Sequence, residues 1–133
     1  MAIRVEWDDL NHTKLKYIYE GSWNWDEFQK ARKQAVSMMD SVDYKIDVII
    51  DIAQSGVLPN NILSRASSIL RERHPREKTT IVIGASPLIR FLYDVARRIY
   101  AEVIDNRGYY IVSNLEEARR IADDHLDRST RIQ

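Results

Sequence analysis

Apolar and polar residues alternate along two short segments near the start of the chain, as they do in half-buried β-strands. The segments span residues 3–7 and 14–20, and turn-forming Asp and Asn residues lie between them. In the second segment Leu15, Tyr17 and Tyr19 share one face of the predicted strand. The pattern therefore predicts an antiparallel hairpin at the edge of a sheet, where a mixed second face is tolerated.

Three later segments are also predicted strands: residues 46–53 and 79–85, which are too apolar for one solvated face, and residues 108–112, the last strand. Runs of this kind are typical of strands buried on both sides in a parallel sheet. The segment from Ile46 to Ala53 is the longest of them and leads into a loop, Gln54–Asn61, which is rich in turn formers. We expect it to be the central strand.

Helical periodicity follows each strand after the first, with a capping residue at the start of each predicted helix. The predicted helix starts are Asn24 with Glu27, Asn60 or Asn61, Ser86 with Pro87, and Asn114 with Glu117. Alternating strands and helices demand right-handed crossovers and a largely parallel sheet. The sequence thus predicts an α/β fold with a five-stranded, mostly parallel sheet, an antiparallel N-terminal hairpin and four helices. We expect a single domain over residues 1–126 and a polar C-terminal tail over residues 127–133.

Composition narrows the classes of function. Twenty basic residues balance twenty acidic ones, so no net charge favours nucleic acid or an anionic membrane. The chain has no cysteine, which removes disulfides and thiolate metal sites. The apolar runs are far shorter than the roughly 20 residues that span a bilayer, and no signal-peptide core opens the sequence. These features predict a cytoplasmic protein without a membrane span or a nucleic-acid partner.

The usual catalytic patterns are missing from the sequence. It contains no Walker loop and no Gly-x-Gly-x-x-Gly, and His12, His74 and His125 are isolated from one another. Asp51, at the end of the central strand, is the one acid expected to be partly buried. An enzyme that used it would need a neighbouring acid or base that the sequence does not reveal. We therefore expect a non-enzymatic protein with no cofactor and no metal.

Ligands of such sheets collect beyond the carboxyl ends of the parallel strands. Two loops qualify, each leading into a predicted helix, and their polar and small residues are Ser55, Gly56, Asn60, Asn61, Gly84 and Ser86. Free backbone N–H groups at the helix starts favour an anion there. The same residues are equally explained as caps and turns. Trp23 and Trp25 present a similar choice, because they could line an apolar ligand site or an interface, or cover the core over the first helix.

A second candidate surface is basic. Arginines gather along and after the predicted second helix, at Arg65, Arg71, Arg73 and Arg76. They suit a docking surface for an acidic partner, although cations near the end of a helix are also explained by its dipole.

The order of elements resembles the STAS fold, and four segments resemble its SpoIIAA-like branch more narrowly. These segments are Trp25–Phe28, Met39–Asp43, Asp47–Asp51 and Arg73–Pro75, and the resemblance covers about residues 3–126. It implies the fold and a non-enzymatic, regulatory role. Related anti-anti-sigma factors carry Asp-Ser-Ser-Gly after the central strand, and the first serine accepts phosphate. Here the same register places Pro59 at that Asp, Asn60 at the acceptor and Asn61 at the second serine, so this position has no hydroxyl.

The sequence-based hypothesis is therefore a cytoplasmic module that binds a protein partner or a small apolar or anionic ligand through Gln54–Asn61 and the helix that follows. The alternative is a carrier or sensor of a lipid or another apolar small molecule, motivated by surplus apolar residues in Leu88–Tyr100. Exposed tyrosines and the hairpin at the edge of the sheet also suit a homodimer.

Overall fold

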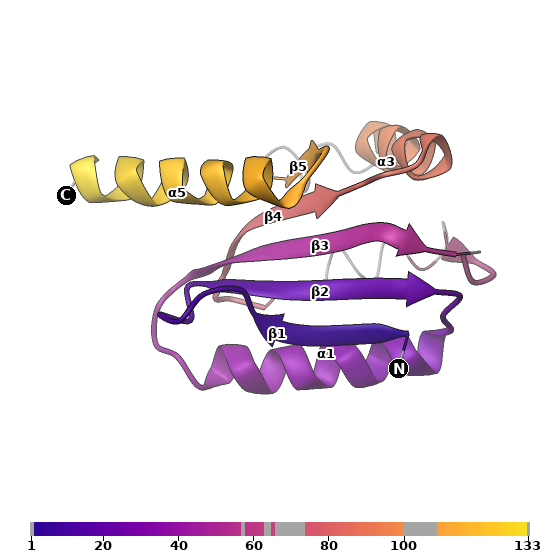
Figure 1. The fold of residues 1–133 in the computed structure, drawn as a ribbon, viewed down its shortest axis with the longest axis horizontal. Helices are drawn as coiled ribbons and strands as arrows, with labels where there is room; N and C mark the ends of the chain where they lie inside the picture. The colour runs from indigo at the N-terminus through magenta and orange to yellow at the C-terminus, as the bar shows by residue number, and fades with distance from the viewer. Residues whose placement is uncertain (1, 57, 63–64, 66–73, 100–108, 133) are drawn as a thin grey trace.

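The computed structural model describes residues 2–56, 58–62, 65, 74–99 and 109–132 (Figure 1). It contains one five-stranded sheet with the strand order β1-β2-β3-β4-β5. The first pair is antiparallel and the other three pairs are parallel, which confirms the predicted topology. The strands are β1 (Ile3–Trp7), β2 (Lys14–Gly21), β3 (Ile46–Ser55), β4 (Glu77–Ile83) and β5 (Tyr109–Val112).

Two helices cover opposite faces of the sheet, each over a different part of it. Helix α1 (Trp25–Asp40) packs with Ala31, Ala35 and Met39 against β1, β2 and β3. Helix α5 (Leu115–Ile132) packs with Ala118 and Ala122 against β3, β4 and β5. Figure 1 shows α1 beside β1 and α5 beside β4 and β5. The central strand β3 serves both cores because successive side chains point to opposite faces.

This arrangement leaves the α5 side of β1 and β2 without a covering helix among the described residues. Lys14, Lys16 and Ile18 of β2 point to this side, because Leu15, Tyr17 and Tyr19 point to α1. The tyrosines are only 6% exposed, and burial raises the pKa of the Tyr17 hydroxyl to about 12. The expectation of exposed tyrosines is therefore wrong for Tyr17 and Tyr19, whereas a homodimer through the edge hairpin stays a prediction.

Three of the four predicted helix starts are confirmed by side-chain caps, at Asn24, Ser86 and Asn114. Asn24 Oδ1 accepts the Glu27 backbone N–H at 2.8 Å, and Asn114 Oδ1 accepts that of Glu117 at 2.9 Å. Ser86 Oγ accepts the Ile89 N–H at the start of α3 (Pro87–Ile99). The two glutamates do not complete reciprocal capping boxes, because Glu27 accepts the Ala2 N–H and Glu117 accepts the Ser113 N–H.

The helices differ in part from the sequence-based expectations. Helix α5 continues to Ile132, so the expected tail is helical to that point; no Gly or Pro after Leu115 stops it. Ile99 and Phe91 of α3, which belong to the apolar segment 88–100, are 64% and 61% exposed. Most of the second predicted helix, which starts at Asn60 or Asn61, lies outside the described residues.

Candidate functional site

The carboxyl end of the sheet, where β2 to β5 finish, carries an aromatic cluster of Trp23, Trp25 and Phe28. The ring centroids of Trp23 and Trp25 lie 5.5 Å apart, and those of Trp25 and Phe28 5.4 Å apart, both edge to face. Trp23 also meets the Tyr19 ring at 5.1 Å and packs on the core. Edge-to-face contacts of this kind fix ring positions. Trp23 thus covers the core, whereas Trp25 forms the outer part of the cluster.

Two of the predicted site residues, Ser55 and Gly56, lie against the end of β2. Ser55 Oγ accepts the Trp23 indole N–H at 3.1 Å. The Gly56 N–H donates to the Gly21 carbonyl at 2.8 Å, and a Cβ at Gly56 would lie 3.0 Å from the backbone of Gly21 and Ser22. The loop after β3 is therefore held close to the aromatic cluster.

Trp25 links the cluster to the start of the next predicted helix. Its indole N–H donates to the Asn60 carbonyl at 2.8 Å, and the Arg65 guanidinium carbon lies 4.8 Å from its ring centroid. Arg65 in turn donates its backbone N–H to the Asn61 carbonyl. Asn60, Asn61 and Arg65 are all exposed. The half-buried Trp25 ring thus contacts exposed polar groups of two predicted site residues, Asn60 and Arg65.

The remaining predicted loop residues lie at the ends of β4 and β3. Gly84 has φ +74°, and a Cβ built on it would lie 2.5 Å from Ala53 Cβ, so the backbones of the two strand ends approach closely. Ser86 is committed to capping α3. Asp51 is half-buried, and its carboxylate accepts the Ala53 backbone N–H at 3.1 Å, a local turn contact.

Two arginines of the predicted basic surface, Arg65 and Arg76, are described, and they lie at opposite ends of the sheet. Arg65 is at the carboxyl end of the sheet, whereas Arg76 precedes β4 at the opposite end, where its carbonyl accepts the Ile46 N–H. Arg71 and Arg73 lie outside the described residues.

The amino end of the sheet, where β3 and β4 begin, presents charged groups that the sequence did not single out. Asp8, in the hairpin turn, has a side chain only 2% exposed and accepts two hydrogen bonds from Arg119 of α5, at 2.8 and 2.9 Å. Lys16 Nζ lies 3.2 Å from the same carboxylate. Burial alone would raise the pKa of Asp8, but the hydrogen bonds and charges of Arg119 and Lys16 outweigh it and hold the pKa below its usual value.

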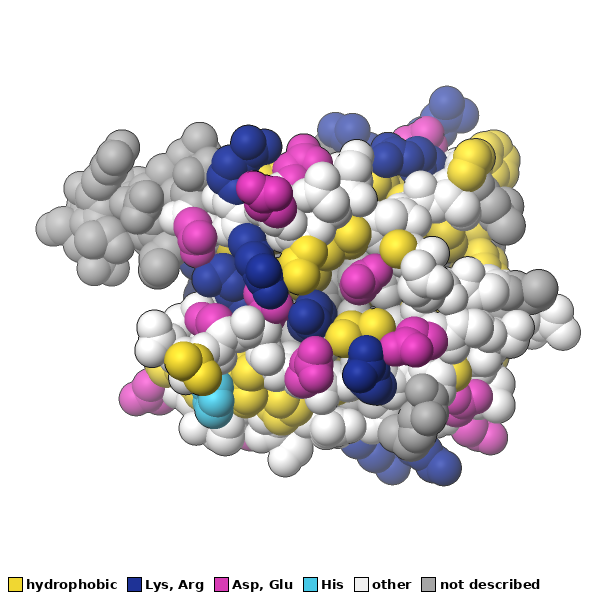
Figure 2. Space-filling view, in the orientation of Figure 1, with side chains coloured by type: hydrophobic (Ala, Val, Ile, Leu, Met, Phe, Trp, Pro, Cys, Tyr) yellow, Lys and Arg dark blue, Asp and Glu magenta, His cyan; other side chains and the backbone are white. Residues whose placement is uncertain are grey.

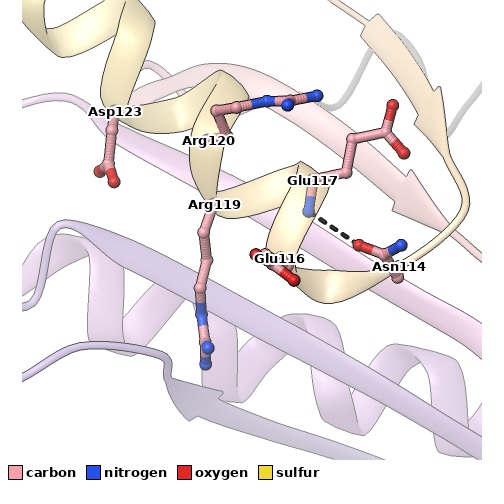
Figure 3. Close-up of a pocket in the computed structure, with 6 residues that line it drawn as sticks. All are labelled: Asn114, Glu116, Glu117, Arg119, Arg120 and Asp123. Carbon is pink, nitrogen blue, oxygen red and sulfur yellow. Dashed lines mark hydrogen bonds between the residues drawn. The ribbon is translucent and has the colours of Figure 1, made fainter.

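A second ion pair joins the hairpin to α5 one helical turn further on. Lys14 Nζ lies 3.0 Å from the Asp123 carboxylate and 3.9 Å from that of Asp9. Arg119 and Asp123 stand four residues apart and so share one side of the helix. Figure 3 shows both side chains extending from the same side of α5, away from Arg120. They border an open groove of about 550 Å³ along α5, lined by Asn114, Glu116, Glu117, Arg119, Arg120 and Asp123.

Next to the Lys14–Asp123 pair lies a pocket of about 340 Å³, which we call the amino-end pocket. Its lining combines the hairpin turn, the segment before β3, the start of β4 and α5: Asn11, Thr13, Lys14, Tyr44, Lys45, Asp47, Lys78 and Ala122. Figure 2 shows Lys and Arg side chains next to Asp and Glu side chains between α5 and the hairpin. The alternation of β2 predicted the face on which Lys14 lies, but no sequence signal indicated what would meet it there.

Neither a metal cluster nor a membrane span is found in the part of the chain that the structure describes. No group of three or more His, Cys, Asp or Glu side chains among these residues could hold a metal ion. His74, one of the isolated histidines, bridges two elements, because its Nε2 lies 2.8 Å from Asp40 Oδ1 and its Nδ1 accepts the Arg76 N–H. Within the described ranges no helix is long and apolar enough to cross a membrane.

The architecture matches solved structures of the SpoIIAA type. An uncharacterised protein of the DUF3478 family from Shewanella loihica PV-4, described as having a SpoIIAA-like fold, aligns with a TM-score of 0.63 and 15% identity over 91% of this chain and 92% of that one. The anti-sigma factor antagonist SpoIIAA, in its unphosphorylated form, aligns with a TM-score of 0.51 and 13% identity over 97% and 98%. The chain therefore has a STAS/SpoIIAA-like fold, as the resemblance implied. No family model matches the sequence, and no curated protein matches it either.

Proposed function

We propose that the protein is a non-enzymatic, cytoplasmic regulatory module that binds a protein partner at the carboxyl end of the sheet. The binding surface comprises the aromatic cluster, residues 54–61 and Arg65. The observation that carries the proposal is the Trp25 ring, which holds the Asn60 carbonyl and the Arg65 guanidinium side by side at the surface. Trp and Arg are the residues most enriched among the energetic centres of protein interfaces.

The fold supports this assignment. A SpoIIAA-like fold suggests a regulatory protein-interaction module, because SpoIIAA itself is described as an anti-sigma factor antagonist. Asn60 stands where the resemblance places the phosphoacceptor serine, so we propose partner binding without a phosphorylation switch at this position. The groove along α5 is lined by charged and polar residues and does not favour the alternative of an apolar carrier.

The test is site-specific photo-crosslinking in the source cell, with a photoreactive amino acid at Asn60 and, as a control, at Lys33 on the exposed side of α1. We expect a discrete protein adduct from position 60 and none of the same mass from position 33. The affinity of the identified partner is then measured for Arg65→Glu and for Arg120→Glu, a matched charge reversal on α5.

We expect Arg65→Glu to weaken binding at least about tenfold, as for a central interface arginine, and Arg120→Glu to bind as the wild type does. Equal affinities for wild type and Arg65→Glu, or no adduct from position 60, would contradict the proposal.

A further inference from the structure

We propose that the amino-end pocket is a separate binding site for a small phosphate-bearing molecule. It lies at the opposite end of the sheet from the proposed partner surface, so it is an additional site. Its volume of about 340 Å³ falls at the lower end of the range of roughly 300–1,000 Å³ that small-molecule pockets occupy. A phosphorylated metabolite of modest size fits such a volume.

The charge of the lining favours an anion. The described lining residues include three lysines, Lys14, Lys45 and Lys78, and one aspartate, Asp47. The lysines come from three separate segments: the start of β2, the residue before β3, and β4. Lysine ammonium groups bind phosphate as point charges with three donors each. Three of them lie around one pocket, where Asp47, Asp9 and Asp123 are their carboxylate partners, so an anion gains a net positive environment when it replaces one of these carboxylates.

Two of the lysines are held in place by the surrounding structure. The Lys78 ammonium lies 3.7 Å from the carboxylate of Asp47, a residue that is only 4% exposed. Lys14 has a side chain 12% exposed and lies between Asp9 and Asp123. The Asp9 carboxylate is fixed in turn by the Thr13 hydroxyl and by the backbone N–H groups of Thr13 and Lys14. The two cations are therefore positioned before a ligand arrives, which lowers the entropic cost of binding.

The site also has an exchangeable counter-ion. Asp123 pairs with Lys14 at 3.0 Å, but its own side chain is 61% exposed. An ion pair with so exposed a partner contributes little stability, and a phosphate dianion can replace the single carboxylate charge beside Lys14. Asp123 lines the neighbouring groove along α5 and pairs with Lys14 from that side, so it competes with a ligand for Lys14, and the exposed Lys45 adds its charge at the rim of the pocket.

One wall of the pocket is held in place by hydrogen bonds of Tyr44. The Tyr44 hydroxyl donates to the Asn11 and His12 carbonyls, at 2.9 and 3.0 Å, and so ties the segment before β3 to the hairpin turn. The Tyr44 ring and the Ala122 methyl, which is buried in the α5 core, provide apolar surface next to the lysines. The pocket therefore offers lysines to the phosphate group of a ligand and apolar surface to its short organic part.

The test uses inorganic pyrophosphate as the probe, followed by amide NMR shifts and calorimetry of the full chain at low salt. We expect saturable shifts concentrated at Thr13, Lys14, Lys45, Asp47 and Lys78. Lys45→Met should weaken binding about fivefold, whereas Lys30→Met, which removes one charge from the exposed side of α1, should leave the dissociation constant unchanged.

Asp123→Asn distinguishes a binding site from a structural ion pair. If Asp123 competes with the ligand for Lys14, its removal should tighten pyrophosphate binding about threefold. Unchanged or weaker binding by Asp123→Asn would overturn this arrangement of the site. Shifts scattered over all basic surfaces, or equal losses in Lys45→Met and Lys30→Met, would show non-specific ion binding and overturn the proposal. The proposed partner surface at Arg65 is not touched by any of these variants.

Discussion

The two ends of the sheet are held together by different forces. At the carboxyl end, aromatic rings, backbone hydrogen bonds and a close approach between Gly84 and Ala53 dominate, and Arg65 is placed by an aromatic face. At the amino end, ion pairs dominate: Asp8 with Arg119 and Lys16, and Lys14 with Asp123. Packing therefore fixes the side chains at the carboxyl end of the sheet, and ion pairs fix those at the amino end.

The difference follows from what covers each region. Trp23 and Phe28 pack over the α1 side of the sheet, where β2 presents apolar residues. The charged residues of β2 point to the other side, where no helix lies directly above β1 and β2 in the described part of the chain. Charged side chains beside α5 keep enough water to remain ionised. They are also close enough to their partners on α5 to favour one position of the helix against the hairpin. A single strand, β2, thus contributes apolar side chains to the packing on one face of the sheet and charged side chains to the ion pairs on the other.

The largest expected effect concerns packing at the carboxyl end. Gly84→Ala combines an unfavourable positive φ with a Cβ placed 2.5 Å from Ala53 Cβ, and should cost about 3 kcal/mol of unfolding free energy. Gly21→Ala is the matched control, because Gly21 has φ +69° but nothing within 4 Å of the added Cβ. It should cost only about 1 kcal/mol. Urea unfolding of both variants measures the difference, and equal costs would show that strand approach is unimportant here.

The next effect tests charge at the amino end. Asp8→Asn replaces a carboxylate that is 2% exposed and bound by Arg119 and Lys16 with a neutral amide. It should lower the free energy of unfolding by about 2 kcal/mol. A double-mutant cycle with Arg119→Gln should give a coupling energy of about 1 kcal/mol or more. The matched cycle is Arg4→Gln with Glu20→Gln, an ion pair on the same side of the hairpin whose side chains are 56% and 51% exposed. Its coupling should stay below about 0.5 kcal/mol.

The same carboxylate predicts a dependence on pH. The pKa of Asp8 is lower in the folded state than in the unfolded chain, since Arg119 and Lys16 outweigh the effect of burial. Its stabilising contribution is therefore fully present above the ordinary Asp pKa and is lost as the pH falls through the lowered value. Unfolding free energies of wild type and Asp8→Asn should converge on acidification. A constant difference from neutral to acid pH would contradict the ionic explanation.

The smallest effect compares one hydrogen bond at each end. Ser55→Ala leaves the half-buried Trp23 indole N–H without its acceptor, and Tyr44→Phe removes the hydroxyl that donates to Asn11 and His12. Each should cost about 1 kcal/mol or less, with the smaller cost for the more exposed Tyr44. Thermal unfolding resolves the pair. A larger loss in Tyr44→Phe would mean that the amino end depends on this wall more than on its charges.

Local patterns predicted the sheet and its helix starts. Alternation placed Leu15 and Tyr17 on the buried face of β2, and the side-chain caps at Asn24, Ser86 and Asn114 form as expected. These features depend on residues close in sequence. The far end of α5 was missed because helix length is limited by stop signals, and the sequence after Leu115 contains none.

The sites were less predictable because they depend on contacts between distant segments. The loop residues near Ser55 and Gly56 were expected to meet at the carboxyl end, yet their contacts to Trp23 and Gly21 require the pairing of β2 with β3. At the amino end, Lys14 and Lys78 become neighbours of one pocket only through the sheet, and Arg119 meets Asp8 across 111 positions. A polar residue on a strand reveals its face but not its partner.

The Asp8–Arg119 contact has a kinetic consequence. It joins positions 111 residues apart, and it can close only after the intervening strands have paired and α5 has docked. Contacts of such long range form late in folding, so their loss mainly accelerates unfolding. In stopped-flow experiments we expect Asp8→Asn to raise the unfolding rate while the refolding rate changes little. The contact thus acts as a lock on the completed fold, lengthening the lifetime of the native state without guiding its formation.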